Sequence, residues 1–226
     1  MTASTDRHQS SAADLPTLVA AGSQALADGD LAAARTAFER AATDFPDEAV
    51  AHNNLGAFYM GIGDDAGAET AFARGAELMP ENAGCLFNLG LARFRQERYD
   101  TAADAFSRAA AAAADDAEIL NNLGACRFHN GELDQARRDI EAALALQPNY
   151  PNAVMNLSDL EYTAGRPDKA VGICQAYLDH HEDAGVARQL LTVLDAVAGK
   201  AKEQLAAPAD TAESTAERSA ALTASE

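Results

Sequence analysis

Aromatic and basic residues are scarce in this sequence. Its 226 residues include no tryptophan, and aromatic residues make up 6% of the chain. There are 17 Lys and Arg against 35 Asp and Glu, so the formal net charge is −18. This charge argues against nucleic-acid binding, which needs a basic surface for the phosphates, and against an anionic membrane surface. No apolar run approaches the length of a membrane span.

Signatures of catalysis and metal binding are also missing. The three cysteines, Cys85, Cys126 and Cys174, form no CxxC pair and are predicted to be reduced thiols that pack as small hydrophobic residues. There is no Gly-rich phosphate loop and no G-x-S-x-G elbow. The five histidines do not show a metal-ligand spacing. We therefore expect a non-catalytic protein with no cofactor and no metal.

The sequence does contain an internal repeat of 34 residues. Its marks are small residues in two registers and a large apolar residue in a third. They are Gly22, Gly56, Gly90 and Gly124; Ala34, Ala68, Ala102, Ala136 and Ala170; Phe38, Phe72, Phe106 and Ile140. A constant period of this length is typical of a helical repeat array. The repeats are predicted at 15–48, 49–82, 83–116, 117–150 and 151–184.

Each repeat is expected to form two antiparallel helices joined by a short turn. The turns are predicted at Gly29-Asp30, Gly63-Asp64, Glu97-Arg98, Gly131-Glu132 and Gly165-Arg166. Pro46, Pro80 and Pro148 follow the second helices, where proline stops a helix from continuing. Asp115-Asp116 can cap the next helix where the third repeat lacks proline.

The spacing and residue types resemble the tetratricopeptide repeat (TPR) family. The resemblance implies an all-α fold, a right-handed α-solenoid of five TPR helix-turn-helix repeats with a C-terminal capping helix at 185–205. Apolar residues at helical spacing in that last segment fit a helix that covers the final repeat. Residues 1–14 are predicted to be a flexible tail because they are polar and lack a helical stripe, and residues 206–226, which are mostly Ala, Ser, Thr and Glu, are predicted to be a disordered tail.

The segment from Leu15 to Ala27 is apolar enough to imitate a signal peptide. Gly22 nevertheless falls on the 34-residue frame together with Ala34 and Phe38 of the same repeat. The segment is therefore interpreted as a repeat helix, and the cytoplasm is the expected location.

First-helix positions that point into the groove of a TPR array give the candidate binding residues. One row is all asparagine, a second mixes amide and apolar residues, and a third is aromatic or Met, with one arginine beside it. The rows are Asn54, Asn88, Asn122 and Asn156; Asn53, Phe87 and Asn121; Met60, Phe94, Phe128 and Tyr162; and Arg95. An asparagine side chain can pair with the N–H and C=O of a peptide together. One asparagine per repeat would meet about every third residue of an extended chain, at about 3.3–3.6 Å per residue.

The asparagine row looks like the ladder in the TPR superhelix of O-linked N-acetylglucosamine transferase, which grips protein substrates by their backbone; the resemblance covers only the repeats. Two structural alternatives stay open. The asparagines can instead bond a neighbouring helix, and the aromatic row can belong to the core. The TPR clamp for acidic chaperone tails is excluded, since Val19, Ser23 and Gly84 stand where it needs basic residues.

The favoured function is an interaction adaptor that binds an extended peptide segment of a protein partner in the concave groove. One alternative is a homo-oligomeric scaffold in which another copy fills the groove or an exposed end. Another is a small chaperone for secretion or complex assembly. No nucleic-acid partner and no membrane insertion are expected.

Overall fold

The computed structural model describes residues 13–180 and the single positions 192 and 199. The described residues form helices and no strand, which confirms the all-α class. The chain divides into two compact units, Met1–Pro148 and Asn149–Glu226. Apart from residues 192 and 199, the predicted capping helix at 185–205 lies outside the described residues, and so do the tail at 206–226, residues 181–184 of the fifth repeat and residues 1–12 of the N-terminal tail.

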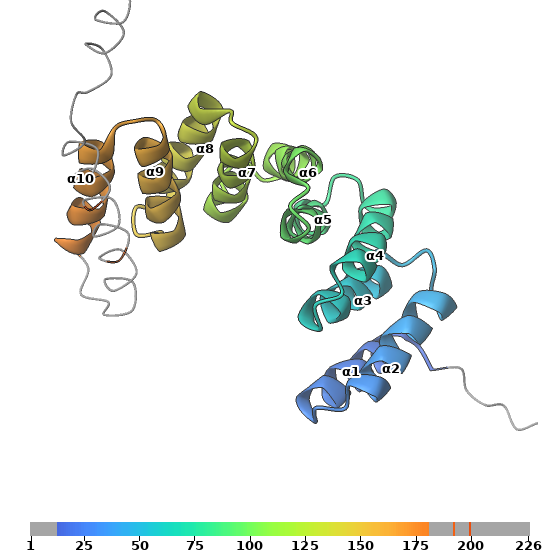
Figure 1. Ribbon diagram of the computed structural model, residues 1–226. Helices are drawn as coiled ribbons and strands as arrows, with labels where there is room; N and C mark the ends of the chain where they lie inside the picture. The colour runs from blue at the N-terminus through green and yellow to red at the C-terminus, as the bar shows by residue number, and fades with distance from the viewer. Residues whose placement is uncertain (1–12, 181–191, 193–198, 200–226) are drawn as a thin grey trace, which may run out of the picture. The chain divides into compact units, whose positions relative to one another are not determined.

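The first unit contains four helix pairs, each a first helix followed by a second helix (Figure 1). The pairs are α1 Leu15–Ala27 with α2 Leu31–Asp44, α3 Ala49–Gly61 with α4 Asp65–Leu78, α5 Ala83–Arg95 with α6 Tyr99–Ala112, and α7 Ala117–His129 with α8 Leu133–Leu146. The second unit contains one pair, α9 Pro151–Thr163 with α10 Pro167–Leu178. Each pair falls within one predicted repeat.

The turn inside each helix pair contains one residue with positive φ. Four of these residues are glycines, with φ between 76° and 81°. The fifth is Glu97, with a φ of 59°, and its Cβ makes the left-handed conformation unfavourable. The turn between α5 and α6 is thus built like the others, although its residue is less suited to it.

Replacing Glu97 with glycine is expected to raise the free energy of unfolding by about 1 kcal/mol, because glycine adopts positive φ without steric cost. Urea denaturation followed by circular dichroism measures the change. Glu97→Ala serves as the control, since it removes the carboxylate but keeps the Cβ, and it should bring no comparable gain. Equal stabilisation by both variants would contradict the backbone explanation.

Aspartates cap the first turns of several helices. Asp30 accepts a hydrogen bond from the backbone N–H of Ala33, and Asp64 does the same for Gly67, both at 2.9 Å. Asp116 accepts bonds from two backbone N–H groups at the start of α7, as predicted for the repeat without a proline. These bonds satisfy donors that a helix N-terminus leaves unpaired.

Small residues on the first helices make room for large residues on the second helices. A Cβ atom added at Gly90 would lie 2.7 Å from the Phe106 ring, closer than real Cβ contacts. The same holds in the other pairs of the first unit: Gly22 with Phe38 at 2.7 Å, Gly56 with Phe72 at 2.6 Å, and Gly124 with Ile140 at 2.6 Å. Phe106 and Ile140 have no exposed surface. The 34-residue period therefore records a packing contact that recurs in each pair.

In the second unit, different residues form the equivalent contact between the first and the second helix. Ser158 takes the glycine register and Cys174 takes the aromatic one, and both are fully buried. The Ser158 hydroxyl donates to the carbonyl of Ala170 at 3.2 Å and accepts from the Cys174 thiol at 3.2 Å. The smaller partner leaves space for a hydroxyl, and the hydrogen bonds satisfy the buried polar group.

All three cysteines are buried and free, as predicted. Burial raises the pKa of each thiol, and it raises the pKa of Cys126 to about 12. The thiols therefore stay protonated at neutral pH and act as packing groups rather than nucleophiles.

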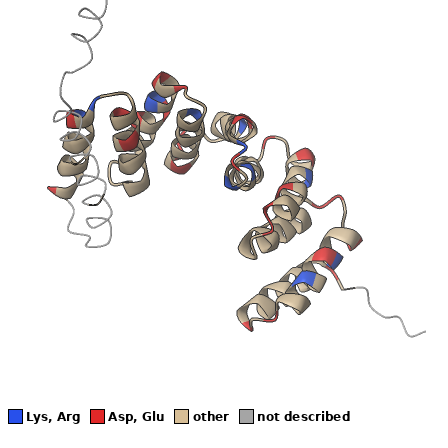
Figure 2. Cartoon of the chain, viewed as in Figure 1, with Lys and Arg blue, Asp and Glu red and all other residues tan. Residues whose placement is uncertain are grey.

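Acidic residues occur in every helix pair (Figure 2). A charge network centred on Glu69 joins α4 to α5 and to the start of α6. This carboxylate accepts hydrogen bonds from the guanidinium groups of Arg93 at 3.0 Å and Arg98 at 2.5 Å, and from the side-chain amide of Gln96 at 3.0 Å. Burial on its own would raise the pKa of Glu69, but the hydrogen bonds from Arg93 and Gln96 and the positive charges of Arg98 and Arg93 lower it overall. The network fixes one repeat against the next.

Candidate peptide-binding surface

The asparagine row starts on the first helices of the first unit. Asn54 on α3 donates from Nδ2 to the carbonyl of Val50 at 2.8 Å, and Asn122 on α7 donates in the same way to Glu118 at 2.8 Å. Both side chains are half-buried. These bonds fix the orientation of the carboxamide and use one of its two N–H groups. Within the described chain, the Oδ1 atoms of both residues accept no hydrogen bond, so each keeps an acceptor and a donor.

Asn88 on α5 is held differently. Its Nδ2 donates to Oδ1 of Asn53 on α3 at 2.8 Å, so two predicted site residues bind each other across neighbouring repeats. One of the two structural alternatives is thus realised in part, because this asparagine does bond an adjacent first helix. The carbonyl of Asn88 accepts no hydrogen bond from the residues described, and it remains an acceptor for a ligand.

Of the remaining members of the second row, Asn121 is buried and Phe87 is half-buried like the asparagines of the first row. Asn121 is only 4% exposed and makes interactions within the protein. Phe87 is half-buried, and its ring lies 5.6 Å from the Phe106 ring, centre to centre. Phe87 thereby connects the surface of α5 to the apolar core beneath it.

Two members of the third row, Phe94 and Phe128, are part of a cluster of rings near the turns. The Phe94 ring meets Tyr99 edge-on at 5.3 Å and His129 at 5.8 Å. The His129 ring stacks on Tyr99 with centres 4.2 Å apart and planes 9° apart, and Phe128 lies 5.6 Å from His129. All but His129 are half-buried, so these rings both stabilise the fold and leave some area at the surface.

Met60 and Arg95 connect the second and third repeats. Met60 is half-buried and packs against the core of this region. Arg95 donates from Nη1 to the Met60 carbonyl at 3.2 Å, and its Nε lies 2.9 Å from Oδ1 of Asp65. Arg95 is therefore partly occupied in holding two repeats together.

The other two candidates, Asn156 and Tyr162, lie on α9 in the second unit. Both are half-buried and both make interactions within the protein. Asn156 occupies the same place in its helix as Asn122 does in α7, as the repeat predicts.

A small hollow lies between α5 and α7, the helices that carry Asn88 and Asn122 of the asparagine row. It has a volume of about 110 Å³ and is lined by Ala83, Gly84, Phe87, Asp116, Glu118 and Ile119. Phe87 and the buried Ile119 are its apolar part, and Asp116 and Glu118 are its acidic part. Gly84 and Glu118 were not among the predicted site residues. The available signal was Gly84 itself, a helix glycine outside the register that faces the large side chains.

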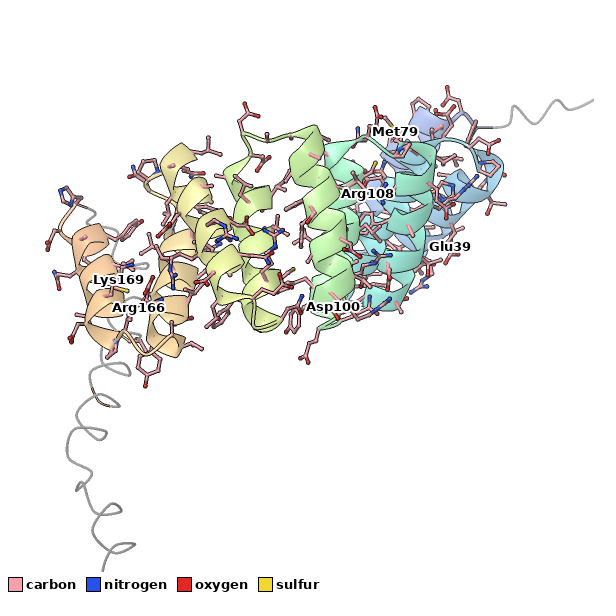
Figure 3. All side chains as sticks on the ribbon, turned by 90° about the horizontal axis from the view of Figure 1, so that it is seen from above. Glu39, Met79, Asp100, Arg108, Arg166 and Lys169 are labelled. Carbon is pink, nitrogen blue, oxygen red and sulfur yellow. The ribbon has the colours of Figure 1, made fainter. Side chains whose placement is uncertain are left out.

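A larger hollow of about 650 Å³ lies between α2, α3 and α4. Its polar side chains are mostly engaged within the protein. The Tyr59 hydroxyl donates to Glu39 at 2.8 Å, and Arg74 pairs with Asp47 at 3.3 Å and Glu77 at 3.2 Å. Figure 3 shows Glu39 on this part of the first unit. None of the asparagines of the row lines this hollow.

No helix in the part of the chain that the structure describes is long and apolar enough to cross a membrane. In the same residues, no three His, Cys, Asp or Glu side chains are grouped closely enough to hold a metal ion.

The sequence matches profiles of the tetratricopeptide repeat over residues 25–90, 87–151 and 130–186. These matches span more than half of the chain, so it belongs to the tetratricopeptide repeat family. The fold is accordingly an all-α TPR solenoid. The comparison with curated protein sequences found no match.

Several solved structures share this fold. A crystal structure of MamA is 25% identical, with a TM-score of 0.66 over 70% of this chain and 92% of MamA. YrrB, a TPR protein with an unusual peptide-binding site, is 20% identical, with a TM-score of 0.66 over 79% of this chain and 92% of its own. TTC0263, a thermophilic TPR protein of Thermus thermophilus, is 22% identical, with a TM-score of 0.61 over 80% of this chain and 99% of its own.

Proposed function

We propose that this protein is a non-catalytic adaptor that binds an extended segment of a partner protein along its first helices. The observation that carries the proposal is the set of unused amide groups on the asparagine row. Asn54 and Asn122 each keep an acceptor and an N–H, and Asn88 keeps an acceptor. One such asparagine occurs in each of these repeats. Their amide groups suit the main chain of a bound peptide, because a main chain offers the same donors and acceptors whatever its sequence.

The hydrogen bonds of the row also support the proposal through their rigidity. Each carboxamide is oriented by a bond within the protein before any ligand arrives. Less side-chain freedom is therefore lost on binding, which favours affinity. Half-buried rings beside the row supply apolar contact area. YrrB has the same fold and a peptide-binding site, which is consistent with this use of the helices.

The double substitution Asn88→Ala and Asn122→Ala tests the proposal. It is expected to weaken binding of an extended peptide roughly tenfold or more, since about 1 kcal/mol is lost for each hydrogen bond. The probes are peptides selected from a random synthetic library on the full-length chain, and fluorescence anisotropy measures their affinity.

Gln135→Ala is the matched control. Gln135 is an exposed carboxamide on a second helix, and its removal should leave the affinity unchanged. If the double variant binds the selected peptides as tightly as the unmodified chain does, the asparagine row is not the binding surface. Light scattering over a range of concentrations accompanies the measurement, because in the scaffold alternative another copy of the chain would fill the groove or an exposed end.

We also infer that the protein works in the cytoplasm. Three buried free thiols, which oxidation would disturb, support a reducing compartment.

A further inference from the structure

The hollow at Gly84 lies in line with the asparagine row. Gly84 stands four residues before Asn88 on α5, and Glu118 stands four residues before Asn122 on α7. Residues four apart share one face of a helix. Asn122 in fact donates to the carbonyl of Glu118. The hollow and the two asparagines therefore belong to the same strip of surface.

The hollow exists because the repeat is broken at one position. The register that holds Gly84 in the third repeat holds Val50, Glu118 and Asn152 in the second, fourth and fifth repeats. Gly84 does not make room for a side chain of the protein, as Gly90 does. A Cβ added at Gly84 would meet only Oδ1 of Asn82, at 3.3 Å. A glycine inside a helix lowers the stability of the protein by roughly 0.5–1 kcal/mol relative to alanine. At Gly84 the missing side chain leaves an opening and makes no packing contact possible that a larger residue would block.

The lining of the hollow defines what fits it. Its volume of about 110 Å³ is well below the roughly 300–1,000 Å³ of small-molecule sites, so it suits one side chain. The Phe87 ring and the buried Ile119 favour an aliphatic group. Asp116 and Glu118 are exposed at the same place. The Asp116 carboxylate caps α7, whereas Glu118 pairs with no cation among the described residues.

We propose that this hollow sets the sequence preference of the groove, taking one aliphatic side chain of a bound segment that carries Lys or Arg beside it. The proposal rests on the proposed function. The asparagines would hold the main chain of the segment, and the hollow would read one of its side chains. The Glu118 carboxylate would face the basic neighbour, which also agrees with the net charge of −18.

The test compares two substitutions of the same glycine. Gly84→Leu should fill the hollow and lower the affinity for peptides selected on the unmodified chain about tenfold or more. Gly84→Ala leaves most of the hollow open and should change the affinity less than about threefold. Both variants add the same Cβ beside Oδ1 of Asn82, so any change in melting temperature should be common to the two. The probes are peptides selected from the random synthetic library, and their shared sequence is read directly.

Charge reversal supplies a second measurement. Selection on Glu118→Lys should replace the basic residue beside the aliphatic one with Asp or Glu. The pocket proposal is overturned if peptides that depend on Asn88 and Asn122 bind Gly84→Leu normally, or if the selected peptides share no aliphatic residue next to Lys or Arg. If the selected peptides bind the Asn88→Ala, Asn122→Ala double variant as tightly as the unmodified chain, or if no peptide is selected, the proposed function and the pocket proposal are both overturned.

Discussion

Replacing Gly90 with alanine is expected to lower the free energy of unfolding by about 2 kcal/mol. On an open helix the same change would stabilise the protein by roughly 0.5–1 kcal/mol. The expected sign is reversed because the new Cβ would lie 2.7 Å from the Phe106 ring. Phe106 has no exposed surface and is enclosed by Ala102, Leu123 and Cys126, so its ring cannot move aside without disturbing other contacts.

Gly75→Ala is the matched control for this prediction. Gly75 lies inside α4, and a Cβ there would meet its nearest neighbour, the carbonyl of Ala49, at an ordinary 3.7 Å. This variant should be stabilised by about 0.5–1 kcal/mol. Urea denaturation followed by circular dichroism measures both changes, and a stabilised Gly90→Ala variant would contradict the close-packing explanation.

A double-mutant cycle identifies the contact itself. Phe106→Leu removes part of the ring and should lower stability on its own. Combined with Gly90→Ala, it should cost less than the sum of the two single changes, because the smaller side chain gives the new methyl group room. Ser158 and Cys174 already show a paired exchange of this kind in the second unit.

Replacing Glu161 with alanine is expected to cost about 2–3 kcal/mol of unfolding free energy. The Glu161 side chain has no exposed surface. It accepts from the guanidinium of Arg166, and one of its oxygens lies 3.2 Å from Nζ of Lys169. Both cations lie at the start of α10 (Figure 3), so the carboxylate ties the end of α9 to the next helix.

Lys169→Ala provides the comparison. The Lys169 side chain is 55% exposed, so water screens its interaction with Glu161. Its removal should therefore lower the free energy of unfolding by less than about 1 kcal/mol. Glu161→Gln keeps the volume of the side chain but removes its charge, and it should fall between the two. Thermal unfolding measures all three variants. Equal small losses for Glu161→Ala and Lys169→Ala would show that the buried carboxylate does not stabilise this helix pair.

The sequence was sufficient for the fold because one contact recurs in it. A glycine on the first helix and a phenylalanine or isoleucine on the second must appear together, and their 34-residue spacing is visible without coordinates. The turns could be predicted as well, because positive φ favours glycine. The turn at Glu97, which has no glycine, was predicted from the 34-residue period alone.

The candidate surface could be predicted only in part. The period placed Asn54, Asn88 and Asn122 at equivalent positions, yet it could not show that Asn88 donates to Asn53 while the other two donate to their own helix. Side-chain hydrogen bonds depend on which rotamers the neighbouring helices leave open. Asn121 likewise occupies a predicted groove position but is only 4% exposed.

The sequence by itself determined the helical repeat, its register and its turns, because these follow from local conformation and from one repeated contact. The tertiary structure decided which amide groups remain unused, and it decided that Gly84 opens a hollow whereas Gly90 accommodates a ring. Both glycines lie on α5, but only Gly90 belongs to the register that recurs every 34 residues. They differ in function because only the packing of neighbouring helices determines what stands opposite each of them.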